Sequence, residues 1–171
     1  MVIRDAYPGE LAEIGELRLA AYRADGFLAP DSGYAQRLRE LGGDGLGAVL
    51  VAVGPDGGPI LGTVMLQSWP NAGPVVQGQG EAEIRALAVR PAAQRAGVGR
   101  ALLTAVIDRA VRDGIRHLLL STQPDMKAAQ HLYEEAGFSR LPERDWSPEP
   151  ADPLLVYGMP LGAREEGMTA V

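Results

Sequence analysis

The sequence predicts a mixed α/β fold with the element order β-α-α-β-β-β-α-β-α-β. Three observations predict it: an amphipathic helical pattern near the N-terminus, a hairpin of apolar strands in the middle, and strand-helix-strand-helix order in the second half. Strand, helix and strand in succession form a parallel crossover, so the sheet is expected to combine an antiparallel first half with a parallel second half. The 22 Gly and 13 Pro residues mark where segments end.

The opening segments predict a short strand at Val2-Ile3 and two helices. The first helix follows Pro8 and stops at Gly26. Its apolar face consists of Leu11, Ile14, Leu17 and Ala21. A shorter helix is expected from Tyr34 to Leu41, because Asp31 or Ser32 precedes it as a cap and Gly42-Gly43 follows it.

The middle of the chain predicts a hairpin and a further strand. Ala48 to Val53 is a β-branched run, Gly54 to Pro59 supplies turn residues, and Ile60 to Trp69 returns as the second strand. After a Gly- and Pro-rich connection, Ala82 to Val89 is the next strand, and Pro91 closes it because proline cannot continue a central ladder.

The second half alternates helices and strands. Val98 to Asp113 has apolar residues at helical spacing and ends at Gly114, and Met126 to Ala136 forms a second helix that ends at Gly137. The strands of this half are expected at His117 to Ser121, at Phe138 to Leu141 as a short piece, and at Leu154 to Met159.

Length and composition predict one domain over residues 1–161 and a flexible tail over residues 162–171. Cysteine is absent, which excludes disulfides, thiolate chemistry and an acyl-enzyme on cysteine. The N-terminus does not have the pattern of a secretory signal, and no run approaches the roughly 18 apolar residues of a membrane span. A cytoplasmic protein that binds no membrane is therefore expected.

The charge of the chain is −6, with a sequence pI of about 4.9, which disfavours binding to nucleic acid. One stretch departs from this acidic balance. Arg85, Arg90, Arg95 and Arg100 occur there without an intervening carboxylate. This contrast favours a small ligand that carries phosphate over a polymer.

The same stretch places glycines between a strand and a helix. The first amides of a helix have no partners within the helix and carry the positive end of its dipole, so Gly97 and Gly99 at this junction predict an anion site. Taken alone, the two glycines are equally compatible with a simple tight turn. The turn is not a Walker loop, because Gly-Lys-Ser/Thr is missing. It is not a dinucleotide-binding fingerprint either, because Leu102 stands where a third glycine is required.

Two motifs resemble the GNAT superfamily of acetyl-CoA-dependent N-acetyltransferases. Gln94-x-x-Gly97-x-Gly99 is similar to the family's acyl-CoA motif, and Ala129-x-x-x-Tyr133-x-x-x-Gly137-Phe138 is similar to its later block. The blocks lie in the family's order, and the resemblance covers most of residues 1–160. It implies a GNAT-like fold with a central, V-splayed mixed sheet, and it implies acetyl-CoA as cosubstrate without a metal.

The resemblance also implies binding roles for individual residues. Leu87 and Val89 would pair with pantetheine, and the turn from Gln94 to Arg100 would wrap the diphosphate. Many members carry Asn where this chain has Met126, and Ser121, Thr122 or Gln123 would then replace that contact. The full set assigned to acetyl-CoA is Leu87, Ala88, Val89, Gln94, Arg95, Ala96, Gly97, Val98, Gly99, Arg100, Met126 and Tyr133.

Tyr133 matches the family's tyrosine that protonates the departing thiolate. A phenol with a pKa near 10 keeps its proton at neutral pH and can give it up in the reaction. Helical aromatic residues are usually part of the core, so a packing role for Tyr133 is the alternative.

A base must deprotonate the ammonium of the acceptor. Glu81 and Glu83 lie two residues apart and face the same side of the strand, the side of Leu87 and Val89 if no bulge intervenes. Glu83 is the first choice because its position resembles that of the base in histone-type members. Glu81 or water remains an alternative, as does a solvated carboxylate without a role in catalysis. The Val89 amide is expected to bind the thioester carbonyl.

The acceptor is expected to be a primary amine on a small molecule or a peptide. Three loops are candidates for binding it: residues 24–33, 69–80 and 143–152. The last contains Trp146 among acidic residues, which could attract and stack a cationic amine, but on composition alone the pattern is more typical of a solvated loop. The acidic residues are Glu143, Asp145, Glu149 and Asp152.

The leading interpretation is direct acetyl transfer in a ternary complex. The alternative is a non-catalytic or regulatory acyl-CoA-binding domain, which Met126 favours and Tyr133 opposes. O-acetylation and longer acyl chains stay open. A homodimer is compatible with the sequence but not indicated by it, and His117 and His131 are expected to be structural or exposed because neither has metal-ligand spacing.

Overall fold

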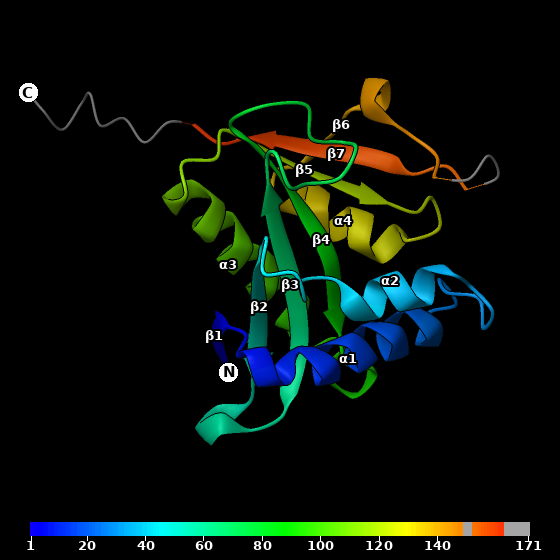
Figure 1. Cartoon of the computed structure of the whole chain (residues 1–171), viewed down its shortest axis with the longest axis vertical. Helices are drawn as coiled ribbons and strands as arrows, with labels where there is room; N and C mark the ends of the chain where they lie inside the picture. Colours follow the sequence, from blue (N-terminus) through cyan, green and yellow to red (C-terminus); the bar gives the residue numbers. More distant parts are fainter. Residues whose placement is uncertain (149–151, 163–171) are drawn as a thin grey trace, which may run out of the picture. The chain divides into compact units, whose positions relative to one another are not determined.

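The computed structural model describes residues 1–148 and 152–162 (Figure 1). Within them, seven strands form a sheet in the order β1-β2-β3-β4-β5-β7-β6. The strands are β1 Val2–Asp5, β2 Ala48–Val53, β3 Ile60–Ser68, β4 Glu81–Val89, β5 His117–Thr122, β6 Ser139–Arg140 and β7 Leu155–Pro160. The α-helices are α1 Leu11–Ala24, α2 Tyr34–Glu40, α3 Val98–Arg112 and α4 Lys127–Glu135. The mixed α/β fold and the element order predicted from the sequence are confirmed.

Internal contacts divide the chain into two compact units. Unit 1 consists of Met1–Gln67 and Ile84–Val106, and unit 2 consists of Ser68–Glu83 and the described part of Ile107–Val171. The boundaries fall inside β4 and α3, so both elements contribute residues to each unit. The expected single domain over 1–161 stays a prediction, and almost all of the expected tail lies outside the described residues.

In unit 1, α1 covers one face of the β2–β3 hairpin. β2 pairs antiparallel with β1 and with β3, as the β-branched runs predict. Alternate residues of β2 face α1, because successive side chains of a strand point to opposite faces. The shared apolar core contains Ile14, Leu17 and Ala21 of α1 and Val49, Val51 and Val53 of β2.

The opposite face of the hairpin receives the first turns of α3. Gly62 of β3 pairs with Ala52, whose side chain points away from α1. A Cβ at Gly62 would lie 2.9 Å from Leu102 Cδ1 and 3.0 Å from Val98 Cγ1. The absence of a side chain at Gly62 therefore allows α3 to approach the strand closely. This approach fixes the start of α3, where the glycine turn ends.

The helices α1 and α2 lie side by side in unit 1, drawn in dark and lighter blue in Figure 1. A Cβ on Gly15 would stand 2.7 Å from the Arg39 carbonyl oxygen, so the two backbones almost touch. Leu19 and Leu38 are buried between them, together with Leu28 from the connecting segment. This close packing holds the α1–α2 pair together.

In unit 2, the strand β7 lies between β5 and β6. β7 is antiparallel to both, with Leu119 opposite Gly158 and Ser139 opposite Gly158 on the other edge. The connection that follows β3 folds onto this sheet, because Val75 and Val76 share a core cluster with Leu119 and Val156.

No helix in the described ranges has the length and apolar character needed to cross a membrane.

Candidate active site

The glycine turn lies in unit 1, between β4 and α3. A short 3₁₀ turn at Pro91–Ala93 follows the strand, and α3 begins at Val98. Two residues of the turn have left-handed backbone conformations: Arg95, with φ 66°, and Gly97, with φ 80°. A side chain at Gly97 would meet nothing within 4 Å, so the backbone faces open space. The turn therefore presents the positive end of a 15-residue helix, α3, to solvent.

The arginines of this stretch divide into two groups. The Arg85 guanidinium donates to Gln67 Oε1 at 3.0 Å, and Arg90 donates to the Ile60 carbonyl at 2.9 Å. These two side chains therefore have protein partners in unit 1. Arg95 and Arg100 are exposed and lie on the turn and the first turn of α3, and Arg100 also has an interaction within the protein. The positive charge predicted for the anion site consequently comes from Arg95 and Arg100 together with the helix dipole.

The strand β4 contains an irregularity that the sequence did not reveal. Ala86 has φ 52°, which is uncommon for a residue with a side chain and typical of a bulge. It interrupts the alternation that would have placed Glu81, Glu83, Leu87 and Val89 on one face. The shared face was expected only in the absence of a bulge, so it does not extend past Ala86.

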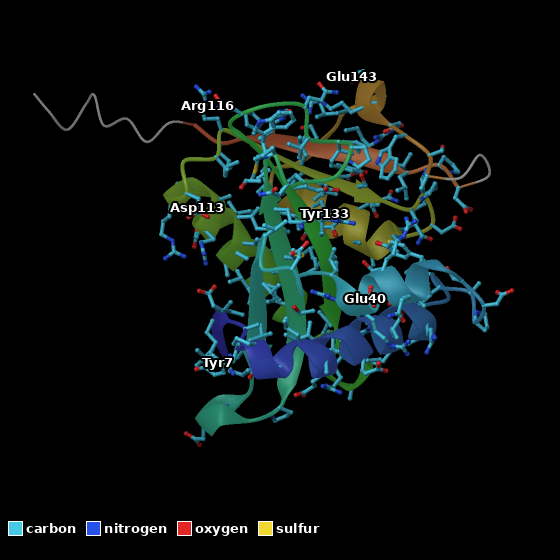
Figure 2. All side chains as sticks on the ribbon, in the orientation of Figure 1. Tyr7, Glu40, Asp113, Arg116, Tyr133 and Glu143 are labelled. Atoms are coloured by element: carbon cyan, nitrogen blue, oxygen red, sulfur yellow. The ribbon has the colours of Figure 1, made fainter. Side chains whose placement is uncertain are left out.

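Tyr133 lies on α4 in unit 2 and is labelled in Figure 2. Its ring is buried, with an edge contact to Phe138 at 6.0 Å between centroids and a tilted contact to Tyr157 at 6.4 Å. Burial raises the pKa of Tyr133 to about 12. The phenol therefore holds its proton throughout the neutral range, as a proton donor must. The same contacts show that Tyr133 also belongs to the core.

Met126 stands immediately before α4. Its sulfur accepts a hydrogen bond from the Thr122 hydroxyl at 3.5 Å, and the Met126 carbonyl accepts from the Gln130 amide. The Gln130 side chain in turn donates to the carbonyls of Gln123 and Pro124. Of the polar residues expected to replace the family's Asn, Thr122 contacts Met126 through its side chain, and the Gln123 carbonyl accepts a hydrogen bond from the Met126 backbone amide at 3.0 Å. Thr122 is nevertheless buried.

Glu81, at the start of β4, belongs to a buried ion-pair network in unit 2. Arg144 Nη1 lies 2.8 Å from both carboxylate oxygens, the Gln77 amide donates at 3.2 Å, and His117 Nδ1 is 3.7 Å away. Burial raises the pKa of Glu81, but the hydrogen bonds from Arg144 and Gln77 outweigh it and hold the pKa below its usual value. The charge of Glu81 is thus fully occupied by protein partners, which favours a structural role.

Glu83 is more deeply buried than Glu81, with 4% of its surface exposed. The amide of Gly73 donates to Glu83 Oε2 at 3.1 Å. Glu81 and Glu83 therefore meet the same connection, residues 69–80, through the amides of Gln77 and Gly73. The face that the two carboxylates share stays a prediction from their spacing.

Both histidines are accounted for by nearby carboxylates. His131 is exposed and lies 2.9 Å from Glu135, and His117 is the outer member of the Glu81 network. Among the described residues, no group of three or more His, Asp or Glu side chains is arranged to hold a metal ion.

Some side chains of the acidic loop after β6 form contacts within the protein. Asp145 forms a bidentate pair with Arg140, and Trp146 Nε1 donates to Ser121 Oγ at 2.9 Å. Both side chains are thereby tied to the unit 2 sheet, which weakens their assignment to amine binding. Glu143 and Asp152 are exposed, whereas Glu149 lies outside the described residues. Sequence reasoning missed Arg144 because its partner lies 63 positions away in the chain.

Comparison with known proteins identifies the family. The model of the acetyltransferase (GNAT) family matches residues 11–138, which include the glycine turn, Glu83 and Tyr133. The chain belongs to the GNAT family of acetyltransferases. The resemblance seen in the two sequence motifs is thus confirmed over most of the chain.

Curated relatives of this GNAT chain match it in part. The [ribosomal protein bS18]-alanine N-acetyltransferase of Haemophilus ducreyi is 35% identical over 88 residues, which is 52% of this chain and 54% of that protein. Mycothiol acetyltransferase of Kocuria rhizophila is 40% identical over 58 residues, or 34% of this chain and 19% of that protein. The matches therefore span about half, or less, of the length of these relatives.

Solved GNAT structures share the fold over almost the whole chain. The ribosomal-protein-S18-alanine N-acetyltransferase of Escherichia coli superposes with a TM-score of 0.70 at 21% identity, covering 96% of both chains. A phosphinothricin acetyltransferase from Sinorhizobium meliloti, solved in complex with acetyl-CoA, gives 0.68 at 20% identity and covers 94% of this chain and 88% of that one. These likenesses establish the fold.

Proposed function

We propose that this GNAT chain transfers an acetyl group from acetyl-CoA to a primary amine of its acceptor. The observation that carries the proposal is the exposed turn between β4 and α3, where Arg95 and Gly97 are left-handed and a side chain at Gly97 would meet nothing within 4 Å, at a helix N-terminus. Such a turn is suited to a pyrophosphate, which needs several converging donors.

The residues of the turn fit acetyl-CoA in charge and in shape. The exposed guanidinium groups of Arg95 and Arg100 supply positive charge beside the amides of the Gln94–Arg100 turn. The strand before the turn, with Leu87 and Val89, supplies backbone for the amides of pantetheine. When bound, acetyl-CoA supplies a thioester whose carbonyl carbon accepts the amine nitrogen as the carbon–sulfur bond breaks.

Tyr133 is the proposed proton donor for the thiolate that leaves. Its raised pKa, about 12, keeps the hydroxyl protonated at neutral pH. The pKa of the phenol is high compared with the usual value for a thiol, about 8.5, so a full transfer is uphill and the phenol contributes largely as a hydrogen-bond donor to the developing charge. The released CoA thiolate then takes its proton from solvent.

Glu83 is the proposed base, acting directly or through water, and the Val89 amide is the proposed donor to the thioester carbonyl. The hydrogen bond from Gly73 orients the Glu83 carboxylate. Glu81 is the weaker choice for the base, because Arg144 binds both of its oxygens. An amine acceptor is supported by the Haemophilus relative, which is named as an alanine N-acetyltransferase.

A second candidate is an acyl-CoA-binding domain without transferase activity. The observation that favours it is Met126, whose sulfur and the Thr122 hydroxyl occupy the place of a family amide. The two candidates share the glycine turn and differ in whether an amine triggers release of CoA.

The deciding experiment is a calorimetric titration with acetyl-CoA, followed by a thiol-release assay with a mixed panel of amines. We expect binding and amine-dependent release; binding without release would support the second candidate, and no binding would overturn both. Gly97→Asp should abolish binding, because it introduces strain and negative charge. Gly57→Asp is the matched control, since Gly57 has φ 74° and equally open space but lies in the β2–β3 hairpin.

A further inference from the structure

Arg18 is the least expected residue of unit 1. It lies in the middle of α1 and is fully buried, with 0% of its surface exposed, although arginine is almost never buried without a partner. Taking a guanidinium out of water costs several kcal/mol unless an opposite charge or hydrogen bonds compensate. The hydrogen bonds that Arg18 forms, and those that it lacks, therefore indicate what the side chain does.

One nitrogen of Arg18 forms hydrogen bonds that join two helices. Nη1 donates to the carbonyl oxygens of Leu38, at 3.1 Å, and Leu41, at 2.7 Å. These carbonyls lie at the C-terminal end of α2, where the last four carbonyls of a helix have no partners within it and a cation is favourable. Nη1 thus links α1 to the end of α2.

The other edge of the same guanidinium forms no hydrogen bond within the described residues. Within the described residues, Nε and Nη2 of Arg18 are buried and have no hydrogen-bond partner, and no carboxylate forms an ion pair with them. This edge, with its parallel N–H groups, is the one that binds a carboxylate in a bidentate manner. A purely structural arginine would leave these buried donors unsatisfied, which is unfavourable because they have given up their hydrogen bonds to water.

Several groups of unit 1 act on Arg18. Burial lowers the pKa of Arg18 to about 10, and among the nearby titratable side chains Tyr22 and Tyr34 raise the pKa whereas Arg85 lowers it. Arg85 directly precedes Ala86, the residue of the β4 bulge, and Ala86 packs against the Leu19, Leu28 and Leu38 cluster. The cluster around Arg18 therefore lies next to the strand whose later residues, Leu87 to Val89, are proposed to hold the thioester end of acetyl-CoA.

We propose that the Nε–Nη2 edge of Arg18 binds a carboxylate of the acceptor, so that the acceptor carries an acid group close to its reactive amine. This inference rests on the proposed function, because it assigns the acceptor of that reaction. Both nitrogens are covered in this structure, so side chains of the α1–α2 region must move to admit the carboxylate. The acceptor class is an amino acid, or a peptide with an acidic residue beside its N-terminus.

The test compares matched acceptors in the thiol-release assay. The first arm uses the common amino acids as free acids, the second uses their carboxamides, and the third uses dipeptide amides with Asp or Glu in second position. We expect free acids or acidic dipeptides to exceed the carboxamides in kcat/KM on the order of 10- to 100-fold, mostly through KM. The better of the two acidic arms identifies the source, and the proposal is overturned if neither the free acids nor the acidic dipeptides exceed the carboxamides.

Two variants distinguish a loss of carboxylate recognition from a general loss of folding or activity. Arg18→Lys keeps a cation for the α2 carbonyls but loses the planar fork, so the preference for acids should fall toward unity while acetyl-CoA affinity stays unchanged. Arg39→Lys makes the same substitution at an exposed arginine that pairs with Glu16 and is the charge-matched control, with the preference retained. An undiminished preference in Arg18→Lys would overturn the proposal.

A binding readout does not depend on turnover. In ¹⁵N-labelled protein with CoA present, the Nε–H signal of Arg18, assigned with Arg18→Lys, should shift when N-acetylalanine is added and stay in place with N-acetylalaninamide. If no amine releases CoA but this shift occurs, the transferase proposal fails and the carboxylate site stands as a binding site. If release occurs but the Arg18 signal does not respond, the carboxylate proposal alone fails.

Discussion

Tyr133 shows how one residue serves both packing and chemistry. Its ring fills the space between Phe138 and Tyr157, which fixes the ring, and the same burial raises its pKa to about 12. Because the ordinary pKa of a tyrosine is about 10, the hydroxyl stays protonated even in mildly alkaline solution. A packing role and a donor role are therefore compatible, and mutation must separate them.

Replacing Tyr133 by Phe removes the hydroxyl and keeps the ring. We expect kcat to fall on the order of 10²-fold, because a hydrogen-bond donor to charge that develops in the transition state contributes about that much, with the Kd of acetyl-CoA within about twofold of the original. Stopped-flow turnover and calorimetry measure the two quantities. Tyr157→Phe is the control, since it removes only the hydrogen bond to Glu134 at 3.0 Å. Weaker binding with intact turnover of the bound enzyme would contradict the assignment.

Glu83 is the residue whose protonation should govern the acid side of the rate profile. Glu83→Gln keeps the shape and removes the basicity, so kcat/KM near neutral pH should drop roughly 10²-fold and the loss of rate at low pH should disappear. The measurement is kcat/KM against pH for both proteins. A profile with the same acid limb in the variant would assign the base to another group or to water.

At the scale of elements, the Glu81–Arg144 pair holds together segments that are distant in sequence. Arg144 also donates to the Val75 carbonyl at 3.0 Å, so it joins the start of β4 to the connection of residues 69–80. That connection supplies the Gly73 amide to Glu83. Arg144 thus positions the connection that orients Glu83.

Glu81→Gln should destabilise the protein by about 2–4 kcal/mol, because it leaves the largely buried Arg144 without its opposite charge. The pKa of Glu81 is lowered in the folded state, so its contribution is complete above the unfolded value of about 4.5 and is lost as pH falls below it. Urea unfolding at pH 7 and at pH 3 tests this. The difference between the two proteins should shrink at pH 3, and an equal difference at both values would be inconsistent with the pair.

At the scale of the whole molecule, acetyl-CoA should act as a stabilising ligand. At a concentration of about 100 times Kd, binding to the folded state alone adds about 2.7 kcal/mol, which corresponds to a rise in Tm of roughly 5–10 °C for a chain of this size. Differential scanning fluorimetry measures the shift. Gly97→Asp should lose it and Gly57→Asp should keep it; a shift retained in Gly97→Asp would place the pyrophosphate elsewhere.

Local patterns predicted most of the fold. The hairpin of β2 and β3, the helix α3 and the short strand β6 were predicted within a few residues of their observed limits. The glycine turn was predicted too, because glycines, proline and helical periodicity act over a few neighbouring residues and need no knowledge of the rest of the chain. The roles of Tyr133 and Glu83 remain predictions.

By itself, the sequence determined the order of the elements, the family and the location of the glycine turn, since each depends on residues that are near one another in the chain. Only the tertiary structure decided that Glu81 pairs with Arg144, because Arg144 lies 63 positions away in the chain. It also decided that Ala86 takes φ 52° and that Arg18 is buried with one edge unsatisfied. Burial and charge pairing depend on segments that are distant in sequence, so they cannot be predicted from a local pattern.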